Sequence, residues 1–283
     1  VWYNSTTGNL RVKGVAIAAF ASAAALPTGT STYNRAGTMT AGLFAGGNTS
    51  TGFSTATYEW NGSGWTSGGA IGTALYSNTG FGTQTAGASA AGRPTNGSSG
   101  DTNATFEYDG SSWTSVNAAN LAARTRQSFG IQTAAAMVGG FSQSGGSYTN
   151  ATEEYDGTNW TTVTVMPAAT ASANAIGTQT AAIVSLGGAP TVATTYVAYD
   201  GTNWTSSPSA NIARARSAAG GTGATSTAGL VIGGTPYNPS VVAETWDGTS
   251  WANSASITTA RYGAGVSDGN TNGIIAGGRT APG

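Results

Sequence analysis

The sequence predicts an all-β chain that folds as a six-bladed β-propeller of four-stranded blades. Three observations support this prediction: an aromatic hairpin motif that recurs along the chain, a small-residue landmark upstream of each motif, and the absence of sustained helical periodicity. A repeat period of forty to fifty residues is typical of a repeat architecture. We expect residues 1–283 to form one domain made of these units.

The hairpin motif is an aromatic residue, then Asn or Asp, then Gly, with Trp three residues after the Gly. It occurs five times, and the Trp residues lie 44–48 positions apart. Asp-Gly or Asn-Gly between aromatic flanks is a strong hairpin signal, because both residues tolerate the positive φ of a tight turn. The units are marked by Trp65, Trp113, Trp160, Trp204 and Trp251.

The second landmark is an apolar run that ends in two small residues, usually Gly-Gly. It occurs six times, one more than the hairpin motif, and reads Ala91-Gly92 once. The extra unit lacks an aromatic hairpin, and residues 1–14 read as strand, turn and strand. We therefore expect the N-terminal strands (1–14) to complete the last blade with the C-terminal strands, closing the ring. A linear solenoid would instead need polar caps at both ends.

The coordinated positions of apolar strand, Gly-Gly, Tyr and spaced Trp resemble the kelch-type β-propellers over nearly the whole chain. That resemblance implies a ring closed by mixing strands from both termini in one blade. The Gly/Thr/Ser-rich, nearly uncharged version of the repeat, and the opening WYNSTTGNL, are similar to bacteriophage tail and virion proteins. The second resemblance implies a location on a virion surface or outside the cell.

Most aromatic and acidic residues of the repeat have a structural interpretation. We expect the five Trp rings to fill the outer gaps between twisted blades, the alternative being a stacking platform for sugars. The turn Asp residues can accept hydrogen bonds from their own downstream amides. Glu59, Glu107 and Glu154 stand in one register immediately before the aromatic residue, which suggests a role between blades.

The composition bears on several classes of function. The chain has 10 Lys and Arg against 11 Asp and Glu, a net charge of -1, so no basic footprint for nucleic acid is indicated. With no His and no Cys, the usual zinc, copper, haem and Cys-nucleophile sites lack their ligands. We expect no cofactor and no metal, although Ca²⁺ at Asp turns and carbonyls stays an alternative. No apolar run is long enough to span a membrane.

The arginines are the strongest candidates for ligand-binding residues. Arg35, Arg126, Arg216 and Arg261 each stand shortly before the Gly-rich inner strand of a different unit. A propeller would bring them round one face near the central opening, where guanidinium groups could bind carboxylate, sulfate or phosphate of a glycan. The alternative is that each Arg binds a neighbouring loop. Arg93, Arg124, Arg214 and Arg279, in or near loops, add a little to the idea.

The sequence thus favours a non-enzymatic binding module that recognises a host-surface glycan or protein, such as a phage tail-fibre or receptor-binding propeller. One alternative is a virion decoration or spacer protein that binds other virion subunits. Another is a glycan-active hydrolase on a propeller scaffold, in which Glu, Asp or Tyr would have to handle protons. No catalytic residues are predicted.

Overall fold

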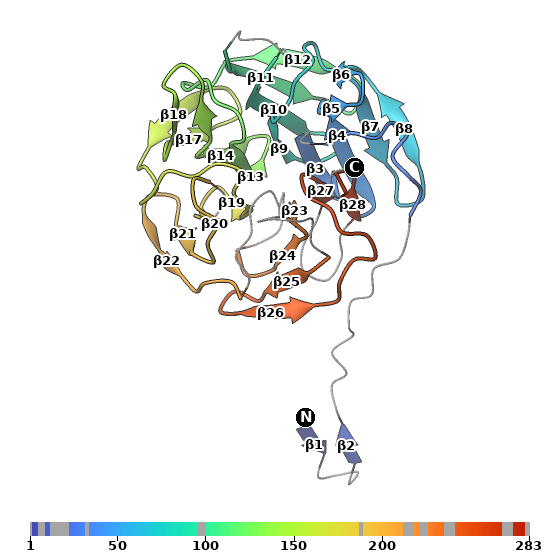
Figure 1. The fold of residues 1–283 in the computed structure, drawn as a ribbon, viewed down its shortest axis with the longest axis vertical. Coiled ribbons are helices and arrows are strands. Elements are labelled where there is room, and N and C mark those ends of the chain that lie inside the picture. The colour runs from blue at the N-terminus through green and yellow to red at the C-terminus, as the bar shows by residue number, and fades with distance from the viewer. Residues whose placement is uncertain are drawn as a thin grey trace.

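The structure is a computed structural model in which the described residues form β-strands, turns and loops. Described are residues 2–4, 9–11, 23–31, 34–94, 100–186, 189–211, 218–220, 226–234, 241–267 and 274–280. The sheets radiate from a common centre and form a disc (Figure 1). The chain is therefore an all-β propeller of small antiparallel sheets.

Five blades are four-stranded, and their strands run antiparallel from the centre of the disc outward. The first contains β3 (Asn34–Thr38), β4 (Ala41–Ala45), β7 (Thr57–Trp60) and β8 (Trp65–Gly68). The second contains β9 (Thr79–Gly82), β10 (Gly87–Gly92), β11 (Thr102–Tyr108) and β12 (Trp113–Val116). The third contains β13 (Gln127–Ile131), β14 (Ala134–Val138), β17 (Thr152–Tyr155) and β18 (Trp160–Val163).

The remaining two complete blades follow the same order. The fourth contains β19 (Ala175–Thr178), β20 (Ala181–Ser185), β21 (Tyr196–Tyr199) and β22 (Trp204–Ser207). The fifth contains β23 (Ala218–Gly220), β24 (Gly229–Ile232), β25 (Ala243–Trp246) and β26 (Trp251–Ser254). Two small hairpins lie between second and third strands, β5 (Asn48–Thr49) with β6 (Gly52–Phe53), and β15 (Phe141–Ser142) with β16 (Ser147–Tyr148).

The predicted number of six four-stranded blades is wrong, because the described residues form five. After the fifth blade comes a two-stranded sheet, β27 (Gly265–Ser267) with β28 (Ile274–Ala276). Its inner strand β27 packs between β23 of the fifth blade and β3 of the first. The two-stranded sheet thus occupies the gap between the two ends of the array, and among the described residues it has no outer hairpin.

The predicted closure of the ring by residues 1–14 is also wrong. β1 (Trp2–Asn4) and β2 (Asn9–Arg11) do form the expected hairpin, but among the described strands they pair only with each other. The hairpin lies apart from the disc (Figure 1). Pairing two neighbouring segments closes only a short loop, whereas reaching β28 requires ordering a much longer one. No strand pairing closes the ring among the described residues.

The turn chemistry predicted for the outer hairpins is confirmed. Asp109, Asp156, Asp200 and Asp247 each accept hydrogen bonds at Oδ1 from the amides two and three residues ahead, at 2.6–2.8 Å. These bonds lower the pKa of all four carboxyl groups, that of Asp247 to about 2. The Gly that follows each Asp has φ between 90° and 96°, which glycine adopts without strain.

The Gly-Gly landmark marks the end of the second strand and links neighbouring blades. Both of its residues have positive φ, for example 60° at Gly139 and 114° at Gly140. The second amide then donates to a carbonyl at the entry of the next unit, as Gly140 N does to Thr170 O at 2.7 Å. The same register gives the links Gly47 N to Leu75 O, Gly92 N to Ala123 O, Gly234 N to Arg261 O and Gly278 N to Thr30 O.

The aromatic residues of the repeat pack between blades, as predicted. Each hairpin pairs its two rings at centroid distances of 4.6–5.3 Å. The outer Trp rings also reach the preceding unit, since Trp113 Nε1 donates to Thr57 Oγ1 and Trp160 Nε1 to Thr105 Oγ1. The Trp rings therefore join blades through both apolar contact and a hydrogen bond.

Candidate functional site

The starts of the innermost strands surround a small cavity at the centre of one face of the disc. Its volume is about 60 Å³, far below the roughly 300–1,000 Å³ of ordinary ligand pockets. The lining comes from several blades and is formed by Arg35, Ser77, Asn78, Thr125, Arg126, Gln127, Ser172, Gly263 and Ala264. We call this the axial cavity. It is large enough for water or a small ion.

Three residues at equivalent positions hold the rim of the axial cavity in a strained backbone conformation. Ser77, Thr125 and Ser172 have φ of 54°, 55° and 53°, a region that costs non-glycine residues about 1–2 kcal/mol each. Their main chains bond in sequence, Thr125 N to Ser77 O at 3.0 Å and Ser172 N to Thr125 O at 3.1 Å. The strain is therefore maintained by hydrogen bonds between blades.

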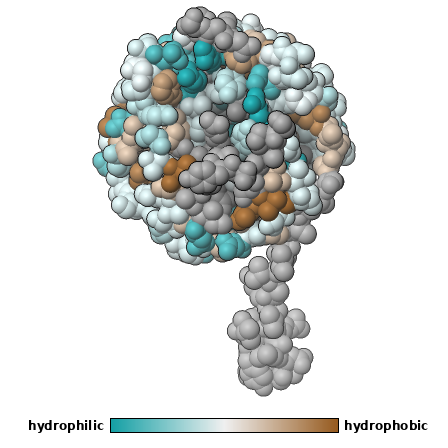
Figure 2. Space-filling view, in the orientation of Figure 1, coloured by the Kyte–Doolittle hydropathy of each residue, from teal (hydrophilic) through white to brown (hydrophobic). Residues whose placement is uncertain are grey.

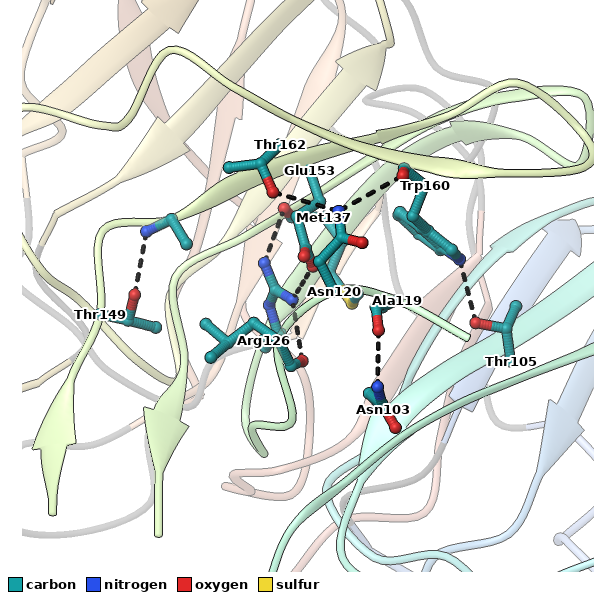
Figure 3. Close-up of polar contacts among 12 residues, drawn as sticks. Asn103, Thr105, Ala119, Asn120, Arg126, Met137, Thr149, Glu153, Trp160 and Thr162 are labelled. Carbon is teal, nitrogen blue, oxygen red and sulfur yellow. Dashed lines mark hydrogen bonds and ion pairs between the residues drawn. The ribbon is translucent and has the colours of Figure 1, made fainter. Parts of the chain in front are cut away.

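Arg126 lies inside the third blade, where its partners are residues of the protein itself. Its side chain is fully buried and forms an ion pair with Glu153 (Figure 3). Further bonds run to Met137 O at 3.2 Å and Leu121 O at 3.4 Å. Burial lowers the pKa of Arg126, and the neighbouring Glu153 carboxylate opposes that shift. The positive charge of Arg126 is thus neutralised within its own blade.

The other predicted arginines are placed differently from one another. Arg35, on β3, also lines the axial cavity and donates from Nη2 to Gln127 Oε1 of the third blade at 3.4 Å. Arg261 donates to Gly277 O at 2.7 Å and does not line the cavity. Arg216 lies outside the described residues. The structure thus brings Arg35 and Arg126 together, and a ligand-binding role for the four arginines stays a prediction.

The described carboxylates outside the turns have structural partners. The suggested role of Glu59, Glu107 and Glu154 between blades is confirmed, because each accepts a hydrogen bond from a Tyr hydroxyl of the following blade. Tyr155 Oη donates to Glu107 at 2.8 Å and Tyr199 Oη to Glu154 at 2.9 Å, and Tyr108 donates to Glu59. Asp101 forms an ion pair with Arg124, and Glu244 Oε1 accepts a hydrogen bond from the main-chain N–H of Asn211.

The sequence interpretation missed three glutamines that link blades. Gln84, Gln132 and Gln179 stand in the turn between first and second strands, and each Nε2 donates to two carbonyls of the preceding blade. Gln132, for example, donates to Gly87 O at 2.9 Å and Tyr108 O at 3.2 Å. The signal was present, because Gln is followed by Thr in all three turns.

Within the described part of the chain, no group of three or more His, Cys, Asp or Glu side chains could hold a metal ion. Among the same residues, no helix is both long and apolar enough to traverse a lipid bilayer.

Comparison with known proteins supports the fold. No family model matches the chain, and no curated protein matches its sequence. A solved structure described as "Structure of YjhT" superposes with a TM-score of 0.75 at 15% sequence identity. The match covers 92% of this chain and 94% of that chain. At this level of identity, the similarity establishes a β-propeller fold and nothing about function.

Proposed function

We propose that the chain is a non-enzymatic binding module, displayed on a virion surface or outside the cell, that recognises a glycan or protein on a host surface. The observation that carries the proposal is that the acidic side chains already have partners within the protein. Ten of the eleven carboxylates of the sequence lie in the described part, and all ten have hydrogen-bond or ion-pair partners that serve turns, blades or loops.

This distribution favours binding over hydrolysis. A glycosidase needs two carboxyl groups that face a common substrate, one of them able to give up or take a proton. Here Glu59, Glu107 and Glu154 are occupied by Tyr hydroxyls between blades, and the turn Asp residues are held in their charged form by backbone amides. These carboxylates therefore stabilise turns and contacts between blades.

The outer surface supports recognition of polar ligands. On the face drawn in Figure 2 the described surface is mostly pale to teal, with brown patches scattered between. Short hydroxyl and amide side chains are abundant in the sequence. Such groups can exchange hydrogen bonds with sugar hydroxyls at low cost in side-chain entropy.

A glycan array with the wild-type protein and the Arg35→Gln variant tests the proposal. We expect binding to a defined set of glycans, with a reduced signal for the variant if the axial face is used. Mass spectrometry of bound oligosaccharides after prolonged incubation is the second measurement. A cleaved oligosaccharide, or no glycan and no host-surface protein bound, would overturn the proposal.

A further inference from the structure

A second, larger cavity lies where the first blade meets the end of the chain. Its volume is about 300 Å³, at the lower end of the range of ligand pockets. It is lined by Thr30, Ser31, Asn48, Thr49, Ser50 and Arg279, with Gly29 and Gly278. We call it the seam groove. None of the sequence patterns pointed to it, apart from the presence of Arg279 near a loop.

The lining is polar and carries a single charge. Four of its residues bear hydroxyl groups and one bears an amide, while Arg279 is the charged residue and no carboxylate is present. Arg124 pairs with Asp101 and Arg126 with Glu153, and none of the ion pairs between described residues involves Arg279. The groove therefore combines hydrogen-bonding groups with a guanidinium that has no anionic partner among those residues.

Arg279 is held in place by its neighbours while its residue stays exposed. Nε donates to Ser31 Oγ at 3.2 Å, and Ser31 is buried. With the Asn48 amide oriented to satisfy both of its ends, Nη2 donates to Asn48 Oδ1 at 2.7 Å. The backbone beneath is also fixed, because Ser31 N and Asn48 O bond at 3.0 Å and Gly278 N donates to Thr30 O. Little ordering would be needed on binding.

The axial cavity lacks this combination. There the buried Arg126 is already paired with Glu153, and the space is about a fifth as large. A planar guanidinium fixed by neutral partners is suited to binding a carboxylate. The surrounding hydroxyl groups are suited to a ligand that itself carries hydroxyl groups.

We infer that the seam groove binds a carboxylated saccharide, with the carboxylate on Arg279 and the sugar hydroxyls on the Ser, Thr and Asn side chains. The inference rests on the proposed glycan-binding function and names the ligand class for one site. It assigns Arg279, rather than the four arginines selected from the sequence, as the residue that contacts the anionic group.

The test is a titration of the full chain, labelled with ¹⁵N, with glucuronate, glucose and acetate at constant ionic strength. We expect glucuronate to bind at least about tenfold more tightly than glucose or acetate, a difference of about one charge-assisted hydrogen bond. The amide signals of Ser31 and Asn48 should shift. Equal affinity for glucose and glucuronate, no binding of glucuronate, or shifts elsewhere would overturn the inference.

Two variants sharpen the result. Arg279→Gln should weaken glucuronate binding about tenfold or more, and Ser50→Trp should block the groove while leaving Arg279 and its bonds intact. Arg124→Gln removes the same charge at a described residue that does not line the groove, and it should leave the affinity unchanged. Unaltered glucuronate binding by both groove variants would contradict the assignment. Glycan-array binding that survives Arg279→Gln would leave the proposed function standing and remove this site alone.

Discussion

The first four blades and the seam between the fifth blade and the first are held together by different interactions. From the first blade to the fourth, every interface has a Tyr–Glu hydrogen bond and a Gln that bonds two carbonyls of its neighbour. At the seam the links among described residues include the packing of β27, the bonds from Gly234 N to Arg261 O and from Gly278 N to Thr30 O, the packing of Ala276 on Phe44 and Trp60, and the contacts of Arg279. Side-chain links between blades are therefore concentrated on one arc of the disc.

The sequence changes where the arc ends. Ala198 stands where earlier blades have Glu, and the facing aromatic residue of the fifth blade is Trp246 rather than Tyr. Trp246 Nε1 donates to Ser226 O of its own blade, just as Trp60 Nε1 of the first blade donates to Met39 O. Met39 and Ser226 occupy the turn position that holds Gln in the other three blades. The first and fifth blades thus lack both the Tyr that bonds to a preceding Glu and the Gln that bonds to carbonyls of the preceding blade.

The largest effect on the arc is expected from Glu153→Ala, which leaves the buried Arg126 charge without a partner. The free energy of unfolding should fall by about 3–5 kcal/mol, measured by urea denaturation. The double variant Arg126→Met/Glu153→Leu is the control, and should recover most of that loss. A loss below about 1 kcal/mol for Glu153→Ala would show that the pair does not stabilise the third blade.

A smaller effect is expected at the Gly-Gly landmark. Gly139→Ala should destabilise the protein by about 2 kcal/mol, since its φ is 60° and a Cβ would meet the Thr170 carbonyl. The matched change is Ala91→Gly, at the one landmark where Ala already has a φ of 57°, and it should be neutral or slightly stabilising. Equal losses from both substitutions in thermal denaturation would contradict the backbone explanation.

Removing one Tyr–Glu hydrogen bond should have the smallest effect. Tyr155→Phe should cost about 1 kcal/mol, and a double-mutant cycle with Glu107→Gln should give coupling of similar size. Trp60 Nε1, at the seam side of the first blade, donates within its own blade, so Trp60→Phe should remove no hydrogen bond to a neighbouring blade and should show weaker coupling to Ala276 than Tyr155 shows to Glu107. Coupling at Trp60 as large as at Tyr155 would remove the distinction between arc and seam.

The same tyrosines predict how stability depends on pH. Burial and the neighbouring Glu carboxylates raise the pKa of Tyr108, Tyr155 and Tyr199 above the ordinary 10.0. The unfolded chain therefore loses these protons first, and the free energy of unfolding should fall as the pH rises above 10. Urea titrations at pH 9, 10 and 11 check this, and Tyr155→Phe should reduce the slope. A slope unchanged in the variant would exclude a contribution from this residue.

The outer hairpins were predictable because their chemistry is local. An Asp at the start of a turn and a Gly three positions before the strand resumes define the same turn in any context, so Trp113, Trp160 and the others mark strands in the structure. The Gly-Gly landmark was predictable for the same reason, since successive positive φ values require small residues.

The closure of the ring and the arrangement of the arginines were not predictable in this way. A hairpin in the sequence does not specify which sheet edge it joins, and β1 and β2 satisfy each other alone. Arg35, Arg126 and Arg261 stand at different distances from the first strand of their units, so a shift of a few residues places one inside the blade and another against a loop. The seam groove depends on residues 248 positions apart, Ser31 and Arg279.

Native-state hydrogen exchange tests the distinction between arc and seam most directly. We predict that the amides of β28 exchange through openings of clearly lower free energy than those of β14 and β20, because among the described residues β28 has no third strand beside it and no Tyr–Glu or Gln link to a neighbouring blade. Glucuronate should slow exchange at the seam while leaving β14 unchanged. Equal protection of β28, β14 and β20 without ligand would contradict the account.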